Sequence, residues 1–156
     1  MTKRDPINPT DNTARAMACD ILRQTRFGAL AVTQPDNDAP YVARVAMLWR
    51  DGAVLTLVST LSTHTAGLQA TPSCSVLVGE PSDKGDPLTH PRMTLQCKAY
   101  TTDKTAEKSA WITAIPKAKL YYDFTDFLMF RLMPETIYLN GGFGRAFRLS
   151  PGDLDF

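Results

Sequence analysis

Residues 41–58 read Tyr-Val-Ala-Arg-Val-Ala-Met-Leu-Trp-Arg-Asp-Gly-Ala-Val-Leu-Thr-Leu-Val, two apolar runs that flank an Asp-Gly pair. Such a pair is typical of a two-residue β-hairpin, because both central residues of a type I′ turn take positive φ angles. We therefore predict strands over 41–50 and 53–58 that are joined by a turn at Asp51-Gly52. If this register continues along both strands, Arg44 faces Ser59.

The rest of the chain carries more strand signals than helix signals. Short apolar or alternating runs predict further strands over 29–33, 74–78, 92–100, 127–132, 136–139 and 145–149. Helical spacing predicts helices over 13–25 and 103–115 and one or two turns over 66–70, with Asp11 or Asn12 capping the first. Because short connections favour antiparallel pairing, we expect a mainly β (α+β) fold. It would be a closed or nearly closed barrel of six or seven strands with flanking helices.

Length and charge limit the classes of function. The 156 residues fit one domain, which we assign to 13–156 after an extended N-terminal arm at 1–12. The net charge of +1 argues against nucleic acid or an anionic membrane as a partner. No apolar run approaches the ~20 residues that span a bilayer. The three cysteines are widely spaced and form no CxxC, so we expect a cytoplasmic protein without a structural metal.

The sequence contains no recognisable catalytic constellation. The two histidines, His64 and His90, lie in separate loops, and the chain has neither a GxSxG elbow nor an HExxH motif. We therefore assign no catalytic residue. The stretch Asn140-Gly-Gly-Phe-Gly144 allows two interpretations: a phosphate cradle built from backbone N–H groups, or a tight turn that needs positive φ.

A polar segment, Ser59-Thr-Leu-Ser-Thr-His-Thr65, follows directly on an apolar strand and precedes an expected helix start. Several short donors at such a position suit a phosphate, which needs convergent N–H and O–H groups and a cation. Arg44 on the partner strand can supply that cation. A solvated Ser/Thr loop is the alternative.

Several segments together resemble a known family. They are Arg44-Val-Ala-Met-Leu48, Leu55 to Leu68, Pro72-Ser-Cys-Ser-Val-Leu-Val78, Asp86-Pro-Leu88 and Pro91-Arg-Met-Thr-Leu-Gln96. In order and spacing they resemble the pyridoxamine 5′-phosphate oxidase-like FMN-binding split barrels, over roughly residues 13–149. The Ser-x-His-Thr segment and the tail Asn140 to Ala146 look most similar to the haem-iron-utilisation branch.

The resemblance implies a six-stranded antiparallel split barrel that forms a homodimer, with FMN in two clefts between the subunits. By position, Arg44 would contact the phosphate, and Val45 and Ala46 would offer backbone groups to the flavin ring. The rest of the phosphate and ribityl site would comprise Ser59, Thr60, Ser62, Thr63, His64 and Thr65. Arg92 and Gln96 would reach the flavin across the dimer. Arg145, near the C-terminal end, is the residue that we expect to bind a substrate.

The chain also departs from the oxidase pattern. Thr63-His64 stand where the oxidase has an Arg-Lys pair, and no histidine follows His90, whereas haem-degrading relatives use a histidine in a C-terminal extension. The resemblance as a whole still leads us to expect an FMN-binding oxidoreductase, acting on an unidentified small organic molecule. The alternatives are a haem-binding or haem-iron-utilisation protein of the same fold, with His64 or His90 as iron ligand, and a non-catalytic flavin carrier or sensor.

Overall fold

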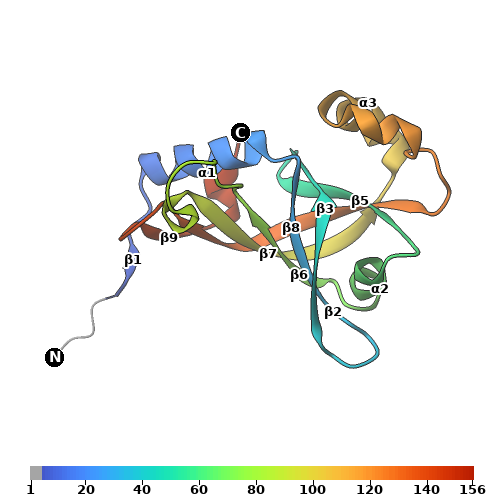
Figure 1. The fold of residues 1–156 in the computed structure, drawn as a ribbon, viewed down its shortest axis with the longest axis horizontal. Helices are drawn as coiled ribbons and strands as arrows, with labels where there is room; N and C mark the ends of the chain where they lie inside the picture. Colours follow the sequence, from blue (N-terminus) through green and yellow to red (C-terminus); the bar gives the residue numbers. More distant parts are fainter. Residues whose placement is uncertain (1–4) are drawn as a thin grey trace.

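The computed structural model describes residues 5–156, and within them nine strands form one strongly curved sheet (Figure 1). The strands are β1 (Ile7–Asn8), β2 (Phe27–Thr33), β3 (Pro40–Ala46), β4 (Leu48–Arg50), β5 (Ala53–Ser59), β6 (Ser73–Val78), β7 (Arg92–Thr102), β8 (Phe127–Asn140) and β9 (Ala146–Leu149). Their order is β1-β9-β8-β7-β6-β2-β3. Strand β5 pairs with the first half of β8, on the edge that β9 takes further along, and β4 pairs with β5. Six of the nine strands are six residues or longer, and every pair except β1–β9 is antiparallel. The expected mainly β, six-stranded barrel with flanking helices is confirmed, with three short strands added.

Three α-helices flank the sheet: α1 (Asn12–Gln24), α2 (Thr63–Ala70) and α3 (Lys104–Ala114). Short 3-10 turns lie at η1 (Pro87–Thr89), η2 (Pro116–Leu120) and η3 (Pro151–Leu154). Asp11, one of the two predicted capping residues, caps α1, because its Oδ1 accepts a hydrogen bond from the Ala14 N–H at 2.8 Å. Helix α2 begins three residues before the predicted turns over 66–70. The predicted arm includes β1, and its residues 1–4 lie outside the described residues.

The predicted hairpin forms at Asp51-Gly52, where the φ angles are 50° and 78° and Arg50 pairs with Ala53. The long strand over 41–50 is wrong, however, because the chain breaks at Met47 into β3 and β4. Met47 is fully buried, and its N–H donates to the Arg26 carbonyl at 2.9 Å. Before Met47 the chain pairs with β2, and after it the chain pairs with β5.

The break at Met47 moves Arg44 to a different neighbour. Arg44 pairs with Ala29 on β2, whereas Ser59 pairs with Phe127 on β8. The prediction that Arg44 faces Ser59 is therefore wrong. Strands β3 and β5 still meet at their Met47 ends, where the Thr56 hydroxyl donates to the Ala46 carbonyl at 2.7 Å.

The predicted runs over 127–132 and 136–139 are one strand, β8. Its register against β7 shifts at Gln96/Cys97, so that Gln96 faces Thr136 and Cys97 faces Pro134. A proline lacks the N–H that a ladder needs, and a β-bulge is a position where a sheet tolerates it. The bulge lets an unbroken β8 serve both halves of the barrel.

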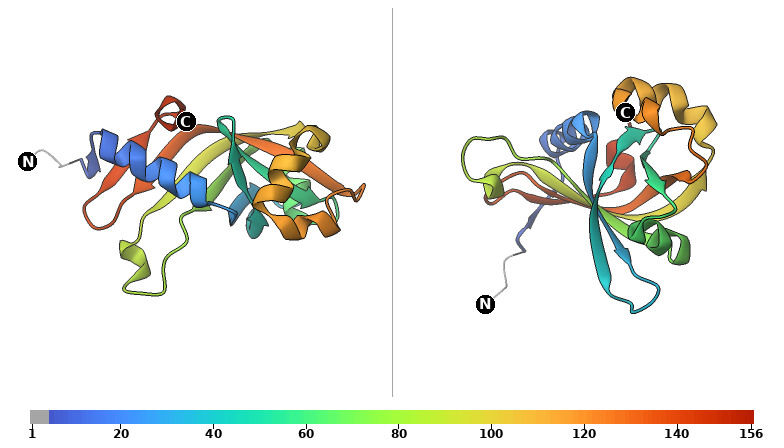
Figure 2. Two further views of the ribbon diagram at one scale, coloured as in Figure 1. Left: turned by 90° about the horizontal axis from the view of Figure 1, so that it is seen from above. Right: turned by 45° about the vertical axis from the view of Figure 1, so that its right-hand side comes forward.

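The core consists of two clusters. The larger fills the barrel between the sheet and the buried side of α1, formed by Ala14, Ala18 and Leu22. The smaller lies under α3 around the fully buried Trp111 and Tyr122. Figure 2 shows α1 and α3 over different parts of the sheet and the β2–β3 hairpin projecting from it, with α2 alongside. Within residues 5–156 no helix is long and apolar enough to cross a membrane.

Candidate functional site

One face of the sheet points away from the core. Two rows of directly paired residues cross β3, β2, β6 and β7 on this outer face. The first row is Arg44, Ala29, Leu77 and Thr94, and the second is Val42, Ala31, Ser75 and Gln96. Arg92 lies on the same face because side chains two apart on a strand point the same way. The structure therefore brings Arg44, Arg92 and Gln96, three of the residues expected to bind a cofactor, onto one surface.

Arg44 is an exposed cation on this face. Its guanidinium carbon lies 5.7 Å from the centre of the Phe27 ring, within the range of a cation–π contact. Among residues 5–156 it forms no ion pair. The guanidinium donors of Arg44 are therefore available to an anion.

Arg92 and Gln96 differ in their contacts with the rest of the protein. The Arg92 Nη1 donates to the Leu88 carbonyl at 2.6 Å, so this side chain holds the loop between β6 and β7. Gln96 is exposed and lines a shallow hollow together with Ser75 and Glu135. Cys97 borders the same hollow, but burial raises the pKa of its thiol and favours the unreactive protonated form.

In the polar segment expected to hold a phosphate, two hydroxyls already form hydrogen bonds within the protein. The Ser59 hydroxyl donates to the Asp126 carboxylate at 2.9 Å, and the buried Thr65 hydroxyl donates to the Ser59 carbonyl at 2.6 Å. These bonds fix the turn that starts α2. The remaining polar side chains of the segment are Thr60, Ser62, Thr63 and His64. Ser62 occupies the N-cap position of α2, yet its hydroxyl accepts no capping bond. The first N–H groups of the helix therefore lack a side-chain partner, and such groups favour an anion.

Val45 and Ala46 offer little free backbone. Val45 is 6% exposed and belongs to the core, and it lies opposite Gly28 in the β2–β3 ladder. The Ala46 carbonyl accepts the Thr56 hydroxyl. Their contact with a flavin ring stays a prediction.

The two histidines are in different states. His64 lies half-buried in the first turn of α2; burial lowers its pKa, and within residues 5–156 its ring forms no hydrogen bond. His90 accepts the Ser82 N–H on Nδ1 at 3.0 Å. In a neutral imidazole the other nitrogen then carries the proton, so Nε2 of His90 is a donor. His64 is therefore the histidine with a lone pair to offer.

The glycine stretch forms the tight turn, one of its two interpretations. It joins β8 to β9 with positive φ at Gly142 (117°) and Gly144 (72°). The Gly141 N–H donates to the Arg145 carbonyl at 2.7 Å, and the Gly142 N–H donates to the Asn140 side chain at 3.0 Å. These N–H groups are engaged within the turn and do not form a cradle. The Arg145 side chain is exposed, and its substrate role stays a prediction.

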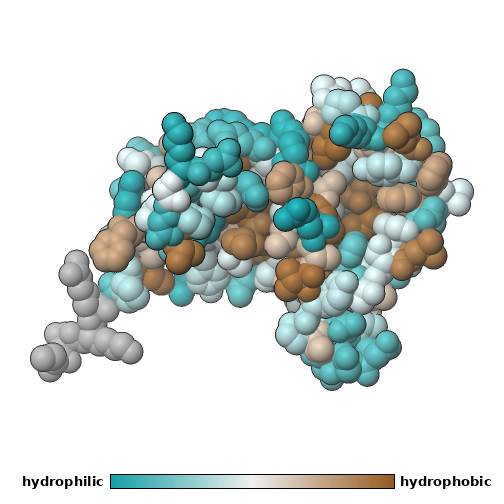
Figure 3. Space-filling view, in the orientation of Figure 1, coloured by the Kyte–Doolittle hydropathy of each residue, from teal (hydrophilic) through white to brown (hydrophobic). Residues whose placement is uncertain are grey.

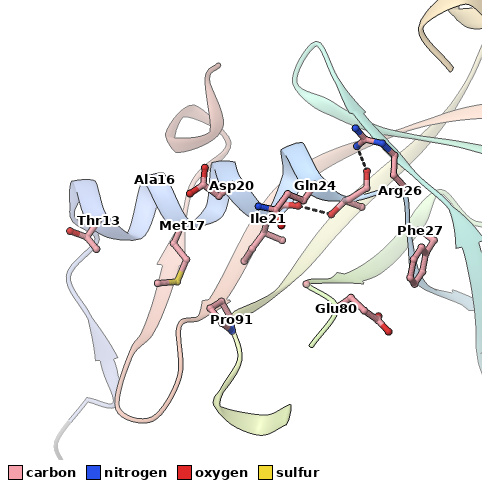
Figure 4. A pocket seen from close by; sticks show the side chains of 12 residues that line it. Thr13, Ala16, Met17, Asp20, Ile21, Gln24, Arg26, Phe27, Glu80 and Pro91 are labelled. Carbon is pink, nitrogen blue, oxygen red and sulfur yellow. Dashed lines mark hydrogen bonds between the residues drawn. The ribbon is translucent and has the colours of Figure 1, made fainter. Parts of the chain in front are cut away.

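A groove that the sequence did not indicate runs beside α1, with a volume of about 560 Å³ (Figure 4). In Figure 4, Met17 and Ile21 point from α1 toward Pro91 in the loop between β6 and β7. At Phe27 and Glu80 the groove meets the smaller hollow that contains Arg44. Figure 3 shows hydrophobic residues exposed below α1 on this side of the molecule. The groove could not be predicted from the sequence, because it depends on how close α1 lies to the loop that contains Pro91, and local sequence patterns do not give that distance.

A pre-formed metal cluster is not part of this surface. Among the described residues no three His, Cys, Asp or Glu side chains gather closely enough to hold a metal ion.

Comparisons with known proteins place the fold and point to haem-related relatives. No family model matches this chain. The "Non-canonical heme oxygenase HOZ, chloroplastic" of Arabidopsis thaliana is 36% identical over 101 residues, which are 62% of this chain and 30% of that protein. A heme-binding protein from Mycobacterium smegmatis superposes with a TM-score of 0.83 at 27% identity, over 95% of this chain and 61% of its own. This chain thus spans less than two thirds of either protein.

A third similarity identifies the fold. A Listeria innocua protein assigned as a pyridoxamine 5′-phosphate oxidase superposes with a TM-score of 0.66 at 19% identity, over 82% of this chain and 98% of that one. At this level of identity the likeness concerns the fold alone.

Proposed function

This chain has the pyridoxamine 5′-phosphate oxidase-like split-barrel fold, and we propose that it binds haem beside Arg44 and the first turn of α2. The proposal reverses the order of the functions expected from the sequence, where an FMN oxidoreductase came first. Both the M. smegmatis protein and HOZ are named for haem, and they are the more similar relatives in sequence.

The main support for the proposal is that the His64 ring is free to bind the haem iron. Haem iron needs an axial ligand, and a neutral imidazole is the ligand of globins and peroxidases. Burial keeps His64 neutral to lower pH than an ordinary histidine, and no hydrogen bond within residues 5–156 occupies its ring. His90 is less suitable because its Nδ1 accepts the Ser82 N–H and its Nε2 therefore carries the proton.

Two groups near the start of α2 and on β3 suit the propionates of haem. The Arg44 guanidinium is free of ion pairs among the described residues, and the first N–H groups of α2 have no capping side chain. Both favour carboxylates, the guanidinium by charge and the helix N-terminus by its dipole. When bound, haem would supply the oxygen and electron chemistry of its iron.

We propose in addition that two copies pair through the outer face. Val42 and Leu77 on this face are 64% and 48% exposed, and Tyr138 on β8, which pairs with Thr94 of the first row, is 37% exposed. Pairing would bury them and bring Gln96 and Arg92 of one copy against the other. Sedimentation velocity tests this: we expect a dimer, and a monomer at micromolar concentration would contradict the pairing.

A competition between cofactors tests the haem proposal. The protein is titrated with hemin and, separately, with FMN, and the bound fraction is followed by absorbance and flavin fluorescence. We expect a saturable Soret shift with hemin and displacement of any bound FMN by hemin. A hemin spectrum that is the same with and without protein would contradict the proposal.

FMN is the second candidate, favoured by the uncapped N-terminus of α2. A phosphate there would receive the N–H groups of Thr63 and His64, and the family resemblance assigns Arg44 to the same phosphate. Replacing Arg44 by Ala should then weaken FMN binding about tenfold to a hundredfold, since a charge-assisted hydrogen bond contributes about 1.5–3 kcal/mol. Turnover of a reduced nicotinamide with FMN would favour the oxidoreductase, and binding without turnover would favour a flavin carrier or sensor.

A further inference from the structure

Another hollow, apart from the proposed haem site, lies between α1, β4 and Phe156. Its volume is about 350 Å³, within the range of small-molecule sites. Its lining consists of Leu22, Arg23, Arg26, Leu48, Trp49, Arg50, Asp51 and Phe156. None of these residues belongs to the surface around Arg44 and α2.

An aromatic ring of the chain itself forms part of the wall of this hollow. The Phe156 ring stacks on Trp49, with ring centres 5.8 Å apart and planes inclined by 21°. On Phe156 also lies the Arg23 guanidinium, whose carbon is 4.6 Å from the ring centre. Both contacts fall within the usual ranges for aromatic stacking and cation–π interaction. The indole and the guanidinium therefore form two flat surfaces that accept one aromatic ring.

The hollow is also positively charged. Three arginines line it against one aspartate. Arg50 is paired with Glu107 on α3, and Arg26 uses Nη1 for the carbonyls of Arg23 and Thr25 at 2.9 and 2.8 Å. The remaining guanidinium nitrogens of Arg26, Nε and Nη2, make no hydrogen bond within residues 5–156. Arg23 has only a distant ion pair, 3.7 Å from an exposed aspartate.

A further donor borders the same place. The Trp49 Nε1 is buried and has no hydrogen-bond acceptor among the described residues. A buried N–H without a partner is costly and is normally satisfied by an acceptor. An oxygen on a bound ligand could satisfy it.

We propose that this hollow binds a small aromatic carboxylate, with Phe156 holding the place of its ring. The ligand ring would lie between Trp49 and Arg23, and its carboxylate would receive the free donors of Arg26. Guanidinium groups bind carboxylates through paired N–H donors and stack on aromatic faces, so both parts of the ligand are recognised. Phe156 is 46% exposed, and its ring must leave its place against Trp49 and Arg23 before a ligand ring can stack there with its carboxylate in the hollow.

Removal of the resident ring should therefore strengthen binding. If the Phe156 ring is stacked on Trp49 about nine-tenths of the time, the apparent affinity of a ligand ring for that place is lowered about tenfold. The Phe156→Ala variant should then bind phenylacetate about tenfold more tightly than the unmodified protein.

Tryptophan fluorescence reports on this site because the chain contains two tryptophans and the other, Trp111, is fully buried under α3. Phenylacetate is titrated into the unmodified protein, Phe156→Ala, and Phe156→Ala combined with Arg23→Gln. 2-Phenylethylamine, with the same ring and the opposite charge, is the ligand control. Circular dichroism verifies that each variant is folded.

We expect saturable quenching that is tightest in Phe156→Ala, weaker when Arg23→Gln is added, and absent with the amine. Three results would overturn the proposal. They are no saturable change in Phe156→Ala up to millimolar phenylacetate, equal affinity with and without Phe156, and equal binding of the amine.

Discussion

Replacing Lys104 by Met should destabilise the fold by about 2–4 kcal/mol, although this lysine lies at the start of a surface helix. Its ammonium donates to three backbone carbonyls in the segment that leads into β8, those of Tyr122, Phe124 and Phe127, at 2.8, 2.7 and 2.8 Å. A hydrogen bond to a charged group contributes about 1.5–3 kcal/mol. Because the three bonds share one ammonium and are partly solvated, we take about the value of one to two such bonds.

Lys108→Met is the matched control. Lys108 lies one turn further along α3 and forms an ion pair of 2.6 Å with Asp123, in which both side chains are well exposed. Both lysine ammonium groups lie at a similar distance from the Tyr122 ring, 5.9 and 6.0 Å. The two variants therefore lose the same contact with the ring and differ in the carbonyl bonds. An exposed pair contributes about 0–1 kcal/mol.

Urea unfolding and calorimetry measure the difference. We expect Lys104→Met to lower Tm by about 4–16 °C, and Lys108→Met by less than about 4 °C, for a chain of this size. Equal shifts in the two variants would refute the reasoning, because the carbonyl bonds would then contribute nothing measurable.

Three further predictions concern packing and pH. Gly67→Ala should lower the free energy of unfolding in urea by about 1–3 kcal/mol, because an added Cβ would lie 2.6 Å from the Val32 side chain. Gly152→Ala is the control and should leave it unchanged, because a Cβ there meets nothing within 4 Å. Equal effects of the two substitutions would contradict this. A hydrogen bond from an arginine on α1 lowers the pKa of Asp153, so its contribution is present above about pH 4 and is lost as pH falls below that value. The stability gap between the unmodified protein and Asp153→Asn should accordingly close between pH 5 and pH 2, and a gap constant with pH would contradict it. Because burial lowers the pKa of His64, haem binding followed by the Soret band should be lost by protonation only below pH 6.5; a midpoint above that value would count against His64 as the ligand.

Local chemistry was sufficient to predict most elements of the fold. The Asp51-Gly52 turn and the Asp11 cap depend on neighbouring residues alone, and both form as predicted. The break at Met47 could not be predicted in this way, because a methionine continues an apolar strand as well as it ends one. The break depends on a hydrogen bond to Arg26, twenty-one positions earlier, and on the pairing of β3 with β2 in place of β5.

The candidate site was predicted less completely for a similar reason. Residue types alone indicated Arg44 and the polar segment, but hydrogen bonding decides which hydroxyls remain available. Ser59 and Thr65 are used within the fold, and the difference between His64 and His90 depends on one backbone N–H from Ser82. Such partners are set by tertiary contacts.

The most direct test of the account compares hemin titrations of His64→Ala and His90→Ala, the two histidine variants that the chain offers. We expect His90→Ala to retain the Soret shift of the unmodified protein and His64→Ala to lose it, with free imidazole restoring it in the latter. An unchanged spectrum in His64→Ala, or a loss confined to His90→Ala, would contradict the assignment of His64 as the iron ligand.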